Sequence, residues 1–197
     1  MKFHRSENEF SETDVISGCN REDNVYRRYL YDYYAPLMKS ICYRYTGDKQ
    51  VAEDLLHDGF IRVFDSIHIF EYRGNGSLKA WMSRIFMNVS LEYLRKIRLQ
   101  PTVSIDEYQE QANVPEEDLR TIPTEVLMHF VAELPDGYRT VFNLYIFEEM
   151  PHKEIAEILH IHEGSSRSQL LRAKALLTKK VNEYLERRKA NPRKIII

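Results

Sequence analysis

The chain contains little glycine and little proline, seven residues of each among 197. Chains built from strands usually alternate polar and apolar residues and are divided by frequent turns rich in these two residues. Alternating runs of β-branched residues are almost absent here. The composition therefore argues against a β-rich fold and predicts an all-α protein.

Cysteines and long apolar runs are also scarce. Cys19 and Cys42 match no metal-ligand spacing and form no disulfide framework, so a reducing cytoplasm is the expected compartment. No apolar run approaches the ~18 residues that a membrane span needs. The N-terminal stretch MKFHRSENEF does not resemble a signal peptide. We expect a cytoplasmic protein without membrane insertion.

The net charge of −2 hides an uneven distribution. Residues 165–197 contain ten Lys and Arg residues against two glutamates, whereas residues 101–125 contain seven acidic residues against Arg120. Segregated charge is evidence about binding partners rather than about fold. It indicates partners of opposite charge for different parts of the chain.

Residues 47–98 predict a helix, a glycine-containing loop and a second helix. In the first helix, apolar residues recur at helical spacing, and Gly59 among them suggests close approach of a helix or a partner. The opposite face collects Glu53, Asp54, His57, Asp58 and Asp65, with Arg62 as its lone base. We expect Ser77 to cap the second helix. That helix buries Leu78, Trp81, Met82, Ile85 and Val89, and displays Lys79, Arg84, Asn88, Arg95 and Lys96.

A helix is also predicted over residues 23–45, after a short one that begins near Ser11 or Thr13 and ends at Gly18. Pro36 should kink or split the longer helix. Its aromatic residues suggest either base stacking or core packing, and core packing is favoured. The expected inward positions are Tyr26, Tyr29 or Leu30, Tyr33, Leu37, Ile41 and Tyr45.

After residue 98 the helical pattern fails until Thr124. We interpret residues 99–123 as a flexible acidic linker between two small helical domains, residues 1–98 and 124–190, with a tail at 191–197. Its acidity is either a solvated surface or a mimic of nucleic acid. In the second domain, Pro135-Asp136-Gly137 predicts a turn.

Residues 152–159 predict a short helix, followed by a turn at Gly164 and a long basic helix. This arrangement is typical of the helix-turn-helix, whose second helix enters the major groove of DNA. Arginine can pair with guanine and glutamine with adenine, while serine and lysine suit phosphates. A merely solvated basic helix is the less favoured alternative. The candidate DNA contacts are Ser165, Arg167, Ser168, Gln169, Arg172 and Lys174.

Evidence for catalysis is weak. Asp54, His57 and Asp58 share a helix turn and suggest a metal pair or an acid/base dyad, but an exposed acidic face is favoured. A metal site at His160 and His162 is less favoured still. No nucleophile elbow or phosphate-binding glycine loop is present. We expect no cofactor and no enzymatic activity.

Three stretches resemble the characteristic blocks of extracytoplasmic-function (ECF) sigma factors, a group within the sigma-70 family. They are AEDLLHDGFIRVF, LKAWMSRIFMNVSLEYLRK and ELPDGYRTVFNLYIFEEMPHKEIAEILHIHEGSSRSQLLRAKALL. The resemblance covers roughly residues 11–185 and includes both region 2 and region 4 of the family. His57, where glutamine is usual, and Pro151, where a capping serine is usual, depart from the common pattern.

The resemblance implies a promoter-specificity subunit of RNA polymerase that helps to open DNA. The exposed face of the first helix would dock on the largest core subunit, and the loop at 71–77 with its following helix would capture the unpaired minus-10 strand. The recognition helix would read the minus-35 element as duplex DNA. An anti-sigma factor is the family's usual regulator. The implied docking residues are Asp54, His57, Asp58, Ile61 and Arg62; the implied minus-10 residues are Arg73, Asn75, Lys79, Arg84, Asn88, Arg95 and Lys96.

Two other functions remain open on the sequence. A stand-alone helix-turn-helix regulator would bind duplex DNA without polymerase, and an inactive sigma-like protein would act as an interaction module only. The first alternative is the stronger, because the helix-turn-helix by itself is shared by many regulators.

Overall fold

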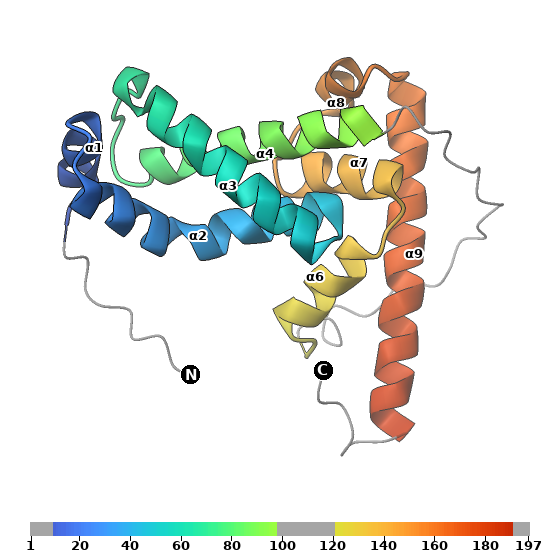
Figure 1. Cartoon of the computed structure of the whole chain (residues 1–197). Coiled ribbons are helices and arrows are strands. Elements are labelled where there is room, and N and C mark those ends of the chain that lie inside the picture. The colour runs from blue at the N-terminus through green and yellow to red at the C-terminus, as the bar shows by residue number, and fades with distance from the viewer. Residues whose placement is uncertain (1–9, 98–120, 191–197) are drawn as a thin grey trace. The chain divides into compact units, whose positions relative to one another are not determined.

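The computed structural model describes residues 10–97 and 121–190. These residues form eight α-helices and one 3-10 helix, and no strand occurs among them. They fall into two compact units, one formed by residues 10–43 and 48–97 and the other chiefly by residues 121–190 (Figure 1). The expected all-α fold is confirmed. The predicted linker, apart from residues 121–123, and the predicted tail at 191–197 lie outside the described residues.

The first unit contains α1 (Glu12–Asn20), α2 (Asn24–Thr46), α3 (Lys49–Ser66), the 3-10 helix η1 (Ile67–Ile69) and α4 (Ser77–Ile97). Gly47 has a φ of +71°, a conformation that suits glycine at the end of α2. The carboxylate of Asp48 then accepts the backbone N–H groups of Gln50 at 2.7 Å and Val51 at 3.0 Å. This N-cap explains why α3 begins directly after α2 ends.

Pro36 lies inside α2, yet α2 runs unbroken from Asn24 to Thr46 (Figure 1). Of the two expected outcomes, a kink or a split, the split is therefore ruled out. A proline removes one helical hydrogen bond, here to the carbonyl of Asp32. Pro36 and Asp32 are both exposed, so water can satisfy that carbonyl.

The buried face of α2 matches the expected one in part, because Leu30, Ile41 and Tyr45 are buried as expected. Tyr33 and Leu37 are 44% and 36% exposed, whereas Tyr34 and Met38 are buried. The sequence offers apolar or aromatic residues at both sets of positions, so its spacing could not decide between two neighbouring faces. Tyr33 therefore lies at the surface and is not part of the core.

The buried contact between α3 and α4 centres on Gly59. A Cβ added at Gly59 would lie 2.2 Å from the ring of Phe86 in α4, which is too close for any real side chain. The close approach that Gly59 suggested is therefore made by a helix of the same unit. In α4, Phe86, Met87 and Leu91 are buried, while Trp81 and Ile85, expected in the core, are half-buried.

Neither cysteine forms a disulfide, and both lie in the interior of the first unit. Cys19 in α1 is 1% exposed and Cys42 in α2 is fully buried. Burial raises the pKa of each thiol to about 11, so neither is a thiolate at neutral pH.

The second unit contains α6 (Thr124–Ala132), α7 (Asp136–Ile146), α8 (His152–Leu159) and α9 (Glu163–Ala190). The expected turn at 135–137 is wrong, because α7 already begins at Asp136 and Pro135 occupies its N-cap position. The connection from α6 is held by Arg139, whose guanidinium donates to the carbonyls of Ala132 at 2.9 Å and Leu134 at 2.7 Å.

The turn between α8 and α9 is made by His160, which has a left-handed φ of +53°. The N–H of Ile161 donates to the carbonyl of Ala156 and closes the end of α8. Gly164, expected to carry this turn, instead lies in the first turn of α9. The helix-turn-helix is present, but a histidine adopts the conformation that glycine was expected to supply.

None of the helices in residues 10–97 and 121–190 is both long enough and apolar enough to cross a bilayer.

Candidate functional site

One face of α3 is lined by the five predicted docking residues. Asp54, His57, Asp58, Ile61 and Arg62 are all exposed, and Ile61 exposes 59% of its surface although it is apolar. Their spacing of three and four residues places them along one side of the helix. The face therefore combines carboxylates with an apolar side chain that is exposed to solvent and not packed in the core.

Arg62 differs from its neighbours on this face because it is already engaged. Its guanidinium makes two parallel bonds to the carboxylate of Glu92 in α4, at 2.9 Å and 2.7 Å. The bond to Arg62 lowers the pKa of Glu92. Arg62 thus joins α3 to α4, and the negative charges of Asp54 and Asp58 remain the outward charge of the face.

The loop after η1 contains two residues in conformations that favour glycine. Gly74 has a φ of +105° and Gly76 a φ of +86°. A Cβ at either position would meet no atom within 4 Å, so the requirement for glycine is conformational and not spatial. Arg73 and Asn75, two predicted minus-10 residues, lie on this loop and are exposed.

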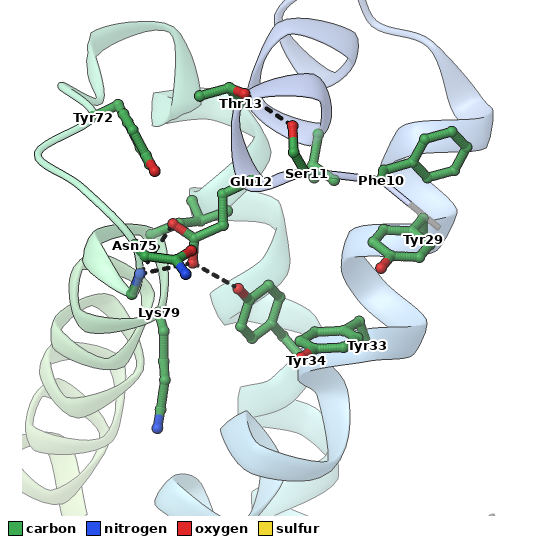
Figure 2. Close-up of a pocket in the computed structure, with 13 residues that line it drawn as sticks. Phe10, Ser11, Glu12, Thr13, Tyr29, Tyr33, Tyr34, Tyr72, Asn75 and Lys79 are labelled. Atoms are coloured by element: carbon green, nitrogen blue, oxygen red, sulfur yellow. Dashed lines mark hydrogen bonds between the residues drawn. The ribbon is translucent and has the colours of Figure 1, made fainter. Parts of the chain in front are cut away.

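A cavity of about 700 Å³ lies between this loop, α1 and α2. Figure 2 shows tyrosine rings from α2 on one side of it and Asn75 with Lys79 on the other. Its size falls within the usual range for small-ligand sites. The lining residues are Phe10, Ser11, Glu12, Thr13, Val15, Tyr29, Tyr33, Tyr34, Tyr72, Asn75, Gly76, Leu78 and Lys79.

Glu12 of α1 holds the loop at the edge of this cavity. Its two carboxylate oxygens accept the backbone N–H of Gly76 at 3.1 Å and 3.2 Å, and one of them accepts the Tyr34 hydroxyl at 3.4 Å (Figure 2). Burial raises the pKa of Tyr34, and the charge of Glu12 adds to the effect, so the hydroxyl stays protonated and can donate.

Ser77 does not cap α4 as expected. Its hydroxyl accepts the N–H of Arg73 at 3.2 Å, a bond within the loop. The N–H of Gly76, immediately before α4, is satisfied by Glu12, 64 residues earlier in the chain. A carboxylate at this end of α4 also complements the helix dipole.

The remaining minus-10 candidates on α4 divide between two places. Lys79 lines the cavity beside Glu12, whereas Asn88 and Arg95 line a second groove of about 440 Å³ that also includes Arg62 and Glu92. Arg84, Asn88 and Arg95 recur at intervals of four and seven residues and so share one face. Arg84 and Lys96 are exposed but line neither cavity. The structure thus separates a loop site from a basic strip on α4.

The start of α9 presents a compact polar and basic face. Arg167, Ser168, Leu171 and Arg172 are all exposed, and Leu171 exposes 63% of its surface. Arg167 pairs with Glu163 at 2.5 Å, and Arg172 lies 3.3 Å from the hydroxyl of Tyr138. An exposed leucine between arginines is a suitable contact for a thymine methyl group.

The other predicted minus-35 residues are placed differently. Gln169 is half-buried, and its side-chain oxygen is buried without a hydrogen-bond partner. Ser165 is half-buried and its carbonyl accepts the Ser168 hydroxyl at 3.0 Å. Lys174 is exposed and its ammonium lies 5.9 Å from the centre of the Tyr145 ring.

A hydrogen bond between side chains joins α8 to the start of α9. His152 Nδ1 lies 2.9 Å from the hydroxyl of Ser166, which is fully buried, and the His152 ring stacks on Tyr145. Burial, and then repulsion by Arg167, lowers the pKa of His152 from its usual value of 6.5. A neutral imidazole is therefore the form that fits this contact.

Across residues 10–97 and 121–190, no group of three or more His, Cys, Asp or Glu side chains is placed to hold a metal ion. The interpretation of Asp54, His57 and Asp58 as an exposed acidic face agrees with their exposure.

Comparison with known proteins assigns both units to one family. Residues 30–99 match the model of sigma-70 region 2, and residues 124–177 match that of sigma-70 region 4. The chain is 32% identical over 169 residues to the ECF RNA polymerase sigma factor SigM of Bacillus subtilis, a match that spans 82% of this chain and 98% of SigM. The chain belongs to the ECF sigma factors of the sigma-70 family.

A second relative agrees with this assignment. This sigma factor is 26% identical over 166 residues to SigW of Bacillus subtilis, covering 78% of this chain and 88% of SigW. Among solved structures, it aligns with the sigma factor RpoE of Bartonella quintana, crystallised with the anti-sigma factor NepR. That alignment has a TM-score of 0.45 and 18% identity, and covers 79% of this chain and 96% of the other.

Sequence reasoning missed two features of the sites in this sigma factor. No sequence pattern near Glu12 predicts its role in the site, because its hydrogen-bond partner Gly76 is distant in the chain. Leu171 had a signal, an apolar residue on the outward face of a basic helix, but no role was inferred for it. Its exposed surface identifies it as part of the α9 face.

Proposed function

We propose that this sigma factor docks on core RNA polymerase through the exposed face of α3. Asp54 and Asp58 supply negative charge, His57 lies between them, and Ile61 adds apolar area. Charge complementarity of this kind steers association and fixes orientation, while an exposed apolar side chain contributes area at the interface. The observation that supports the proposal is that these side chains are exposed on one side of α3, where the His57 ring stacks on Tyr31 of α2.

The first unit would then capture the unpaired minus-10 strand. A flipped base is read by hydrogen bonds to its edge and by stacking on aromatic rings, and its strand is held by cations along the backbone. The cavity beside loop 71–77 offers tyrosine rings and an amide, and α4 offers the cations. The residues proposed for this step are Arg73, Asn75, Lys79, Arg84, Asn88, Arg95 and Lys96.

The second unit would read the minus-35 element as duplex DNA. We assign base contacts to Arg167, Ser168 and Arg172, which are exposed on one face of α9. Phosphate contacts are assigned to Ser165 and Lys174. Gln169 can read adenine only if its buried amide turns outward, so it is the weakest member of the set.

The functional layout follows from these assignments. Residues 1–98 act as the polymerase-docking and minus-10 domain, residues 99–123 as a tether, and residues 124–190 as the minus-35 domain, with a tail at 191–197. Every assigned role is one of binding, so we propose a cytoplasmic protein without catalytic activity. An anti-sigma factor that covers these surfaces is the proposed regulator.

Reconstitution with core polymerase tests the proposal against its main alternative. We expect the purified chain to make transcription from supercoiled DNA promoter-selective, and to bind duplex DNA weakly by itself. A stand-alone regulator would bind duplex DNA tightly without core enzyme and would leave transcription unselective. Tight duplex binding combined with no effect on core polymerase would overturn the sigma mechanism for this chain.

A further inference from the structure

The helix α1 precedes residues 30–99, the stretch that matches the region 2 family model. It nevertheless forms one wall of the cavity beside loop 71–77. Among the residues that line this cavity, Glu12 carries the only carboxylate. A negative charge is unexpected in a site meant for a nucleic acid strand and therefore needs an explanation.

Glu12 is held in place by the local structure of α1. The Ser11 hydroxyl accepts the N–H of Asp14 at 3.1 Å, and the Asp14 carboxylate accepts the N–H of Ser11 at 3.2 Å. This reciprocal pair is a capping box that fixes the first turn of the helix. Val15 and Cys19 anchor the same helix in the core. The Glu12 carboxylate is therefore carried by a helix whose first turn is held in place.

The bonds that Glu12 makes leave part of its acceptor capacity unused. A carboxylate offers about four acceptor positions on its two oxygens. One N–H, from Gly76, and one hydroxyl, from Tyr34, are directed at them. Figure 2 shows Glu12 next to Asn75, between the loop and the tyrosines of α2. A donor group of a ligand in the cavity can therefore reach a free lone pair.

We propose that Glu12 makes this cavity selective for a base with an exocyclic amino group, which means cytosine, adenine or guanine and not thymine. This inference rests on the proposed capture of the minus-10 strand. The amino group would donate to the Glu12 carboxylate while the base lies among the tyrosine rings. Thymine presents one N–H between two carbonyl oxygens, and an ionised carboxylate, which only accepts hydrogen bonds, repels those oxygens.

The test uses the full chain bound to core polymerase and a promoter bubble whose unpaired minus-10 strand is randomised. Sequencing of the bound DNA identifies the position with the strongest preference for amino-bearing bases. At that position, 5-methylcytosine is compared with thymine, because the two differ at C4 by an amino group in place of an oxygen. We expect the wild-type complex to bind the strand with 5-methylcytosine about tenfold more tightly than the strand with thymine.

Glu12→Gln should bring the ratio of the affinities for 5-methylcytosine and thymine close to one. The glutamine oxygen can still accept the Gly76 N–H, so the loop stays in place, while the amide nitrogen can donate to the thymine oxygen. Asp32→Asn is the matched control, because it removes the same charge from an exposed position on α2 that does not line the cavity. We expect this control to keep the wild-type ratio.

Two results would overturn the inference: an unchanged ratio in Glu12→Gln, or a wild-type strand preference that nowhere favours an amino-bearing base. Helical circular dichroism of both variants shows that the fold is retained. A wild-type chain that gives no promoter-selective transcription with core polymerase would instead refute the proposed function. The two failures are therefore distinguishable.

Discussion

The ring of Phe86 in α4 packs against the backbone of α3 at Gly59, where an added Cβ would lie 2.2 Å from the ring. This contact lets α3, which carries the proposed docking face, and α4, which carries the basic strip, approach closely. It also explains a glycine in a helix interior, which otherwise costs stability.

Gly59→Ala should therefore destabilise the protein, by about 1–3 kcal/mol, because overpacking a core outweighs the better helix propensity of alanine. Gly164→Ala is the matched control in α9, where an added Cβ would meet no atom within 4 Å. We expect that control to stabilise the protein by roughly 0.5–1 kcal/mol. Denaturant unfolding followed by circular dichroism measures both, and equal effects in the two variants would contradict the packing argument.

Asp58→Lys should abolish binding to core polymerase and leave the helical circular dichroism intact. The lysine places a positive charge at the centre of the acidic face, where it opposes a complementary surface on the partner. Asp32→Lys makes the same charge change on an exposed part of α2. Co-purification with core enzyme compares the two, and equal retention of both would refute the docking assignment.

Arg62→Ala should weaken core binding far less than Asp58→Lys does. The Arg62 guanidinium is committed to Glu92 by two hydrogen bonds, so it adds little to the outward charge. Its loss should instead cost about 0.5–1 kcal/mol of stability, as expected for a partly exposed pair. The charge-swapped double variant Arg62→Glu/Glu92→Arg should recover the lost stability in an unfolding experiment. If its free energy of unfolding falls by the sum of the losses in Arg62→Glu and Glu92→Arg alone, the pair contributes nothing.

Arg172→Ala should weaken promoter-selective initiation by about 1–3 kcal/mol, and mainly at one base pair of the upstream element. A uniform loss across all sequences would mean that Arg172 contacts only phosphate. Lys189→Ala, an exposed base at the far end of α9, is the control and should leave selectivity unchanged. Run-off transcription on matched and mismatched upstream elements measures the difference.

Acid should destabilise the second unit through His152. Because the pKa of His152 is lowered in the folded state, its contribution to stability is complete above the unfolded value of 6.5 and is lost as the pH falls through the folded value. Between about pH 7.5 and about pH 5.5, the wild type should lose more thermal stability than His152→Gln, whose amide can still bond to Ser166.

His68→Gln, an exposed histidine in η1, serves as the control for this titration and should lose as much stability as the wild type. An identical acid response in His152→Gln and the wild type would show that the Ser166 contact does not depend on the charge of the imidazole. Nuclear magnetic resonance of the imidazole C–H signals would give the direction of the shift independently.

Features set by neighbouring residues could be predicted from the sequence. The exposed acidic face of α3 depends on residues within a turn or two of one another, and it was predicted from their spacing. The helix-turn-helix was also predicted, because a polar run follows an amphipathic helix at the required spacing, although its turn was placed at Gly164, inside the first turn of α9.

Features set by distant residues could not be predicted in this way. The N-terminal end of α4 is capped by Glu12 and not by the nearby Ser77. The tertiary fold brings the Glu12 carboxylate, a stronger hydrogen-bond acceptor than the Ser77 hydroxyl, to the N–H of Gly76. The inward face of α2 depends on which of two apolar stripes meets α3 and α4. The turn after α8 is made at His160, which has a left-handed φ, and not at Gly164 as expected.

The two buried thiols give this protein an internal reporter of local opening. A reagent specific for thiolates cannot reach Cys19 or Cys42 until the surrounding helices separate, so the rate of modification measures how often they do. Cys19 reports on the detachment of α1, the helix that carries Glu12, and Cys42 on the opening of α2. Labelling kinetics at these native positions can therefore follow the wall of the cavity without any introduced probe.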